Sequence, residues 1–219
     1  MGIDADRKPK GCPIVSPRDG SDLLTMASVA SSAVGMLLAV SGLPRLAIVP
    51  LVACGILDSF DGRFASSFDR SEVSRSYGAE LDSVSDAMAF GSLPACMLLS
   101  SARTGSVPWY AVAVSVIFLM CVARRLAWFG ALDRTGASDG SFVGLPTTYA
   151  SIVLPVVHTL VEIAGLSAHA VPVMACTMLA LALVFVANVP IARPGTKTIL
   201  AFAAVGVACA VRIVLTEVP

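Results

Sequence analysis

Charge is scarce in this sequence. Only 14% of the 219 residues are Asp, Glu, Lys or Arg, and 15 basic residues balance 15 acidic ones. Because a protein binds a polyanion through an excess of positive charge, this balance does not indicate a nucleic-acid partner. Apolar residues make up 56% of the chain, and the mean hydropathy is +0.83. This composition excludes an ordinary soluble domain and indicates a membrane protein.

Cysteine patterns that would build a disulfide framework or bind a metal are also missing. The six cysteines are scattered, mostly inside apolar runs, and we interpret them as small apolar fillers. The start of the chain lacks the charged and then apolar sequence of a cleaved signal peptide. Residues 1–21 are instead polar and contain three prolines, so we expect a cytosolic or interfacial tail.

Long apolar runs, in contrast, are abundant. Helices of roughly 20 apolar residues are long enough to cross a bilayer. Seven such segments are present, at about 23–43, 45–67, 77–101, 107–129, 145–165, 170–189 and 196–215. We therefore expect an all-α, polytopic membrane helix bundle over residues 22–217, with six core transmembrane helices and a seventh at the C-terminus. His158 and Glu162 are four residues apart on the fifth segment, where they are positioned to pair.

The basic residues indicate how this bundle lies in the cell membrane. With the N-terminus in the cytoplasm, 12 of the 15 Lys and Arg residues fall on the cytoplasmic side of the seven segments. Cytoplasmic loops of membrane proteins carry such an excess of positive charge. The same orientation places the polar turn at 66–77 in the cytoplasm.

Four aspartates flank that turn. Asp58 and Asp61 are three residues apart near the end of one apolar segment, and Asp82 and Asp86 are four apart near the start of the next. Each pair shares one helix face, and antiparallel helices aim both pairs at one point. A carboxylate in or near a bilayer costs free energy, so such a residue usually has a functional role. A set of oxygen ligands of this kind suits Mg²⁺, Mn²⁺ or Ca²⁺. The alternative is that the four cap helix ends or pair with Arg63, Arg70 and Arg75.

This stretch resembles the signature of the CDP-alcohol phosphatidyltransferases, D-x2-D-G-x2-A-R-x8-G-x3-D-x3-D. The matching residues are Asp58, Asp61, Gly62, Ala65, Gly78, Asp82 and Asp86. Ser66 stands where the family has Arg, and the turn between Ala65 and Gly78 is three residues longer than in the family. Arg63, Arg70 and Arg75 are candidates to replace that Arg.

The resemblance implies a division of roles among these residues. A metal site of two Mg²⁺ or Mn²⁺ ions would be formed by Asp58, Asp61, Asp82 and Asp86. The nucleotide and its pyrophosphate would contact Asp58, Asp61, Gly62, Ala65, Ser66, Gly78 and Asp82. Asp86 would also be the catalytic base that takes the proton of an attacking hydroxyl group. A homodimer is implied as well.

Later segments resemble the phosphatidylserine synthase branch of the family. They are Arg124–Gly130, Phe142–Thr147 and, more faintly, Pro194–Lys197. The implied reaction moves a phosphatidyl-type group from CDP-diacylglycerol or CDP-archaeol to a hydroxyl acceptor, L-serine first, and releases CMP. Arg124, Arg125 and Lys197 are candidates to hold the lipid phosphate or the acceptor carboxylate. Ordinary anchoring of positive charge at the cytoplasmic surface is the alternative for these three.

Three other functions remain open at this stage. The same chemistry is compatible with inositol phosphate, glycerol phosphate or choline as acceptor. A degenerate family member would bind nucleotide poorly, because Ser66 replaces the Arg. A divalent-cation transporter would use carboxylates along its path, but the four aspartates lie near one end of their helices and the last two segments have no equivalent acidic pair.

Overall fold

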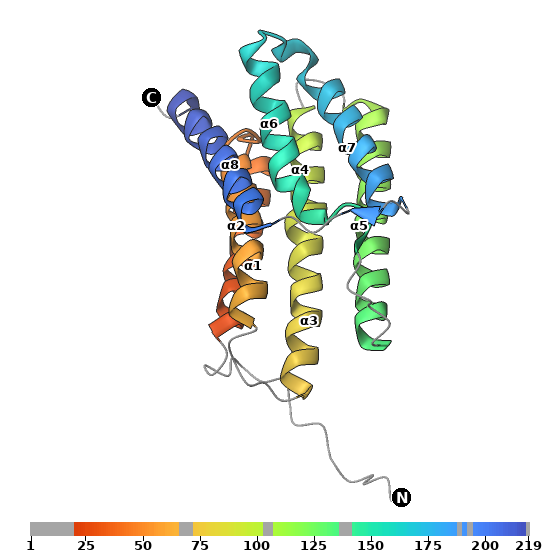
Figure 1. Ribbon diagram of the computed structural model, residues 1–219. Helices are drawn as coiled ribbons and strands as arrows, with labels where there is room; N and C mark the ends of the chain where they lie inside the picture. Colours follow the sequence, from red (N-terminus) through yellow and green to blue (C-terminus); the bar gives the residue numbers. More distant parts are fainter. Residues whose placement is uncertain are drawn as a thin grey trace, which may run out of the picture.

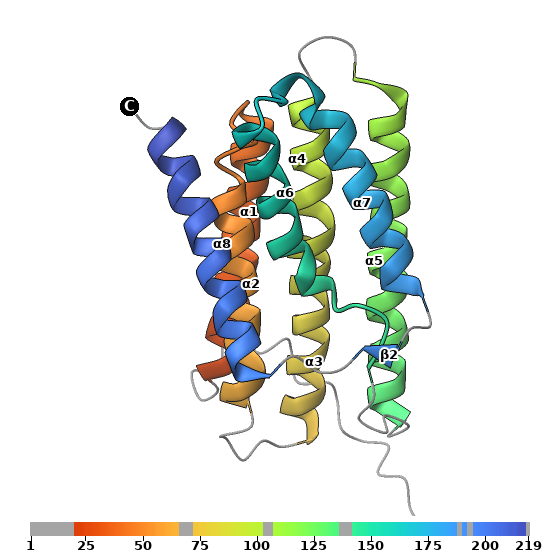
Figure 2. The same ribbon diagram turned by 45° about the horizontal axis from the view of Figure 1, so that its top comes forward.

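The computed structural model describes residues 20–65, 72–102, 107–135, 142–187, 190–191 and 195–217. These residues form a helical bundle with one small antiparallel strand pair (Figures 1 and 2). The α-helices are α1 Gly20–Val40, α2 Ile48–Ala65, α3 Glu72–Asp86, α4 Leu93–Ser101, α5 Trp109–Thr135, α6 Ala150–Ile163, α7 Ala170–Val186 and α8 Thr196–Glu217. A π-helix, η1 (Ala87–Ser92), joins α3 to α4, and 3₁₀ turns η2 (Thr147–Tyr149) and η3 (Ser167–His169) precede α6 and α7. The strands β1 (Phe142–Val143) and β2 (Pro190–Ile191) pair with each other.

Several of these helices suit a bilayer. Four are long and apolar enough to cross one, at Asp22–Val40, Trp109–Leu132, Ser167–Val186 and Lys197–Glu217. Ile48–Phe60 in α2 and Thr147–Ile163 are apolar but shorter. The expected all-helical membrane protein is confirmed, whereas the count of six or seven spans stays a prediction. The predicted tail, 1–21, lies outside the described residues except for the first two residues of α1.

Two glycines end helices at the same side of the bundle. Gly42 follows α1 with a φ of +90°, and Gly165 follows α6 with a φ of +69°. After Gly42, the Leu43 amide donates to the Leu38 carbonyl at 2.9 Å, and after Gly165 the Leu166 amide donates to the Val161 carbonyl at 3.0 Å. This left-handed ending satisfies the last carbonyls of a helix and favours glycine, because a side chain is strained there.

Close helix contacts bring α2 and α6 together. A Cβ atom on Gly55 of α2 would overlap the Ser151 Oγ of α6 and lie 2.6 Å from the Ser151 Cβ. Small residues permit this approach where lipid provides little driving force between helices. Large buried side chains, among them Phe90, Phe118 and Phe185, fill the remaining interior. The close packing of α2 on α6 positions the start of α6 beside Asp58.

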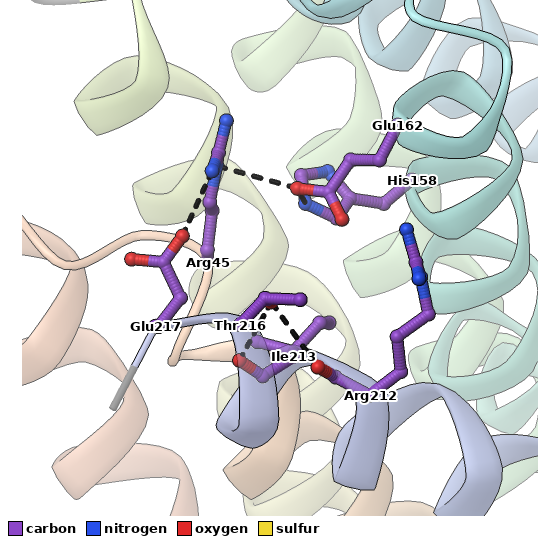
Figure 3. Close-up of polar contacts among 7 residues, drawn as sticks. All are labelled: Arg45, His158, Glu162, Arg212, Ile213, Thr216 and Glu217. Carbon is purple, nitrogen blue, oxygen red and sulfur yellow. Dashed lines mark hydrogen bonds and ion pairs between the residues drawn. The ribbon is translucent and has the colours of Figure 1, made fainter. Parts of the chain in front are cut away.

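A cluster of charged residues lies where the α1–α2 turn, α6 and the end of α8 meet (Figure 3). Arg45 donates to Glu217 Oε1 of α8 over 2.8 Å, and its Nε lies 3.4 Å from Glu162 Oε1 of α6. The predicted pairing of His158 with Glu162 is confirmed, with Nε2 and Oε1 3.2 Å apart. Arg45 thus links the C-terminal helix to the rest of the bundle.

Candidate metal and nucleotide site

Three of the predicted aspartates converge. One carboxylate oxygen from each of Asp58, Asp82 and Asp86 lies within 4.8 Å of one from each of the other two. Asp58 comes from α2, whereas Asp82 and Asp86 lie one turn apart on α3. All three are half-buried. The helix spacing read from the sequence therefore predicted their meeting point correctly.

This donor set fits a divalent cation. Mg²⁺ binds oxygen ligands at ~2.1 Å, so opposite ligands of one ion lie ~4.2 Å apart, and Ca²⁺ accepts somewhat longer spacings. The oxygens of the three carboxylates, within 4.8 Å of one another, need only small side-chain movements to reach such distances. Three carboxylates held this close also repel one another unless a cation or protons neutralise them.

Two threonines of η2, the turn just before α6, complete the cluster. The Thr148 hydroxyl donates to Asp58 Oδ2 over 2.8 Å, and the Thr147 hydroxyl donates to the Asp86 carboxylate. Thr147 is buried and Thr148 half-buried. Hydrogen bonds of this kind fix the orientation of carboxylates that bind a metal. Sequence reasoning missed both roles, although the Phe142–Thr147 segment ends at the first of these residues.

The backbone opens into a π-helix directly after Asp86. The Leu93 amide donates to the Met88 carbonyl, five residues back, and the Ser92 hydroxyl donates to the Ala87 carbonyl at 3.3 Å. Pro94 follows, and a proline ring in an α-helix clashes with the carbonyl four residues earlier. The wider turn accommodates Pro94 and, in other proteins, often marks a functional site. It also lets α3 and α4 continue as one long rod (Figure 1).

Arg125 lies in the interior near this cluster. Its guanidinium donates to the Phe185 carbonyl at 3.2 Å and the Gly144 carbonyl at 3.5 Å, and lies 4.4 Å from the centre of the Phe129 ring. It is close enough to Asp86 to interact with that carboxylate electrostatically. Gly144 has a φ of +80°, and a Cβ atom there would lie 2.8 Å from Arg125 Nη1. Arg125, one of the three predicted basic residues, is therefore held in place by backbone carbonyls.

The other two basic candidates are placed differently. Arg124 is exposed and lines, together with Arg125 and Trp128, a cavity of about 530 Å³ between α5 and the end of α7. Lys197 is exposed in the first turn of α8. Their binding of lipid phosphate or acceptor stays a prediction.

A cavity of about 190 Å³ opens beside Asp58. Its polar wall includes Asp58, Ser59, Thr148 and Ser151, and its apolar wall comes from α2, α8 and the segment that leads into α6. Hydroxyl groups thus surround the candidate metal ligand on the side that faces α6.

Some predicted site residues lie outside the described part of the chain. Ser66 is one of them, as is Arg70. Asp61, Gly62, Arg63, Ala65 and Arg75 belong to described helices, but their side chains and surroundings are not described. Gly78 lies half-buried one turn before Asp82 on α3. Asp61 follows Asp58 by three residues on α2, so the helix backbone places both on one face.

Comparison with known proteins agrees with the resemblance carried by this aspartate cluster. The sequence model of a family described as CDP-alcohol phosphatidyltransferase matches residues 20–186, which is well over half of the chain. The chain belongs to the CDP-alcohol phosphatidyltransferase family. The matched range ends with α7, so α8 lies beyond it.

The following three relatives are all named as serine phosphatidyltransferases or archaetidylserine synthases. The chain is 32% identical over 144 residues to a CDP-diacylglycerol–serine O-phosphatidyltransferase of Mycobacterium bovis, covering 64% of this chain and 48% of that protein. A protein of the same name from Methanocaldococcus jannaschii is 34% identical over 134 residues, or 61% of this chain and 57% of its own length. An archaetidylserine synthase of Methanothermobacter thermautotrophicus is 29% identical over 133 residues, covering 61% and 54%. The chain spans about half the length of the curated relatives it matches.

Proposed function

We propose that this protein transfers a phosphatidyl-type group from a CDP-linked lipid to L-serine and releases CMP. The observation that carries the proposal is the convergence of Asp58, Asp82 and Asp86 inside a bundle that belongs to the CDP-alcohol phosphatidyltransferase family. Serine is favoured as the acceptor by the names of three relatives, one from a mycobacterium and two from archaea. CDP-diacylglycerol and CDP-archaeol are both compatible donors.

In this proposal the aspartates bind Mg²⁺ or Mn²⁺. Asp58 and Asp82 would hold the ions together with Asp61, and Asp86 would complete the second position. The ions supply positive charge that stabilises the departing pyrophosphate oxygen. Thr148 fixes the orientation of Asp58 through its hydrogen bond of 2.8 Å. The cytidine nucleotide would contact Gly62, Ala65, Ser66 and Gly78.

The chemistry is a single displacement at phosphorus. The serine hydroxyl oxygen attacks the lipid-linked phosphorus, a new P–O bond forms, and the P–O bond to CMP breaks. Asp86 accepts the proton of the hydroxyl group as the bond forms, which is general-base catalysis. Arg125, buried close to Asp86, contributes positive charge near the transferred phosphate. CMP then leaves with the electrons of the broken bond.

We also propose that the site faces the cytoplasm and that the protein forms a homodimer. The cytoplasmic orientation is supported by the 12 of 15 basic residues that the positive-inside rule places there. The dimer is supported by the family resemblance alone. Six or seven transmembrane helices are compatible with the seven helical rods of the bundle, if α3, η1 and α4 are taken as one.

An acceptor panel tests this proposal. Purified protein with CDP-diacylglycerol and Mn²⁺ is supplied with serine, glycerol phosphate, inositol, inositol phosphate or choline, and CMP release is measured. We expect serine to give the highest rate, with phosphatidylserine as the lipid product. A higher rate with another acceptor would support the proposed transfer reaction but contradict serine as the acceptor. Absence of CMP release with every acceptor would indicate a degenerate member of the family.

A further inference from the structure

Two neighbouring cavities are lined by α2 and α8. The first is the 190 Å³ cavity beside Asp58, whose far wall is built by Val52 and Ile56 of α2 and by α8 residues such as Phe202. The second is a groove of about 350 Å³ lined by nine residues of the same two helices, all of them apolar. Val52 and Ile56 line both spaces. The cavity beside Asp58 and the apolar groove therefore share one wall.

Gly206 of α8 packs closely against this shared wall. A Cβ atom on Gly206 would lie 3.1 Å from Val52 Cγ1, tighter than most such contacts, and Gly206 lines the first cavity. Tyr149 and Phe202 pack edge to face with ring centres 5.5 Å apart, and both line the first cavity as well. These contacts fix α8 against α2 and η2 beside the first cavity.

The groove has the length and exposure that a lipid chain needs. At 1.5 Å per residue, α8 rises ~20 Å between Phe202 and Leu215, more than half of a bilayer core ~30 Å thick. Val207, Val211 and Leu215 line the groove and are 45%, 51% and 75% exposed, so the groove is open along its side. Figures 1 and 2 place α8 at the edge of the bundle, beside α2.

We propose that this groove holds one hydrocarbon chain of the CDP-linked lipid, with the oxygens nearest the headgroup in the cavity beside Asp58 and Thr148. The inference rests on the proposed function, because it takes the lipid of that reaction as the occupant. Three observations favour this occupant: a wall shared with the cavity beside a candidate metal ligand, hydroxyl groups in that cavity only, and an entirely apolar groove. The wall formed by α8 lies beyond the range that the family match covers.

The free energy of lipid binding limits the role of the groove. A lipid chain in the bilayer is already in an apolar environment, so entering the groove gains close packing rather than hydrophobic transfer. The groove therefore positions the phosphorus next to the aspartates more than it increases overall affinity. Blocking it is expected to affect long-chain donors and to spare short-chain ones.

A matched pair of variants tests the groove. Val207 and Val205 are both 45% exposed on α8, but only Val207 lines the groove. For Val207→Trp we expect the KM for a dioleoyl donor to rise about tenfold, the effect of moderate overpacking, with little change for a dibutanoyl donor. Val205→Trp should leave both donors within about twofold of wild type, as surface substitutions usually do. Equal behaviour of the two variants would overturn the proposal.

A cross-linking measurement separates this inference from the reaction itself. A CDP-lipid with a diazirine near the end of one chain is photolysed with the wild-type protein, and the labelled peptides are identified. Labels within 49–56 and 207–215 are expected. Normal CMP release with labels elsewhere would contradict the groove alone, whereas missing CMP release would contradict the reaction. A change of dimer fraction in Val207→Trp without a change in KM would assign the groove to a second copy of the chain.

Discussion

Asp58 and Asp86 occupy one cluster but have different neighbours. Asp58 accepts the hydrogen bond of Thr148 and lines the cavity, whereas Asp86 contacts Thr147 next to the buried Arg125. Their environments match the two roles that the proposed reaction requires. In the proposed reaction Asp58 would hold an ion, and Asp86 would hold one and receive a proton.

This difference predicts a separation of binding from turnover. Asp86→Asn should keep much of its binding of CDP-lipid with Mn²⁺ but lose at least about two orders of magnitude in turnover, because a general base contributes ~10²–10⁴-fold. Asp58→Asn should lose the binding of CDP-lipid as well as turnover. Binding is measured by calorimetric titration and turnover by CMP release for each variant. Glu80 is exposed on α3, the helix of Asp86, and Glu80→Gln is the control that should leave both unchanged. Equal loss of binding in both Asp variants would make Asp86 only a further ligand.

The aspartates were predictable and the threonines were not. Spacings of three and four residues on a helix define a shared face, and a short turn brings two such faces together. Thr148 lies 90 residues from Asp58, and no spacing rule joins them. Its position depends on the close approach of Gly55 to Ser151, which only the packed bundle reveals.

At the scale of helices, apolar runs located the elements but not their ends. The segment predicted at 77–101 begins at Glu72, because α3 starts with polar residues that a hydropathy criterion does not detect. For the same reason α5 continues to Thr135, beyond the apolar run that ends near 129. The π-helix after Asp86 cannot be distinguished from an α-helix by the apolar residues of its sequence. Only Pro94, which an α-helix would not accommodate easily, indicated a distortion there.

The contact of Arg45 with Glu217 predicts how α8 is held. The hydrogen bond to Glu217 raises the pKa of the Arg45 guanidinium above its ordinary value. Because the folded-state pKa is the higher one, this contribution is fully present below the unfolded-state pKa of the guanidinium and is lost as pH rises through the folded-state pKa. Arg45 is about half exposed, and we expect a coupling of only ~0.2–1 kcal/mol.

A double-mutant cycle measures that coupling. Arg45→Gln, Glu217→Gln and the double variant are unfolded in detergent, and the free energies of unfolding are compared. We expect the double variant to be less destabilised than the sum of the single ones. Strict additivity would show that α8 is held by its packing on α2 and α6 alone.

For the whole molecule, the distribution of charge predicts one orientation in the membrane. Ala131 is exposed near the end of α5, and Ser167 is exposed in the turn between α6 and α7. A cysteine at position 131 should react with an impermeant maleimide only from the cytoplasmic side, and one at position 167 only from outside. Both should react in opened vesicles, which is the control. The reverse pattern would place the aspartate cluster on the side away from cytosolic nucleotides.

Metal-dependent release of CMP tests the central claim most directly. With CDP-diacylglycerol and L-serine, we expect CMP release to stop in EDTA and to return with Mn²⁺ or Mg²⁺. Asp82→Asn should lose about three orders of magnitude, which corresponds to ~4 kcal/mol of transition-state stabilisation. Undiminished turnover in EDTA, or wild-type turnover in Asp82→Asn, would contradict the account.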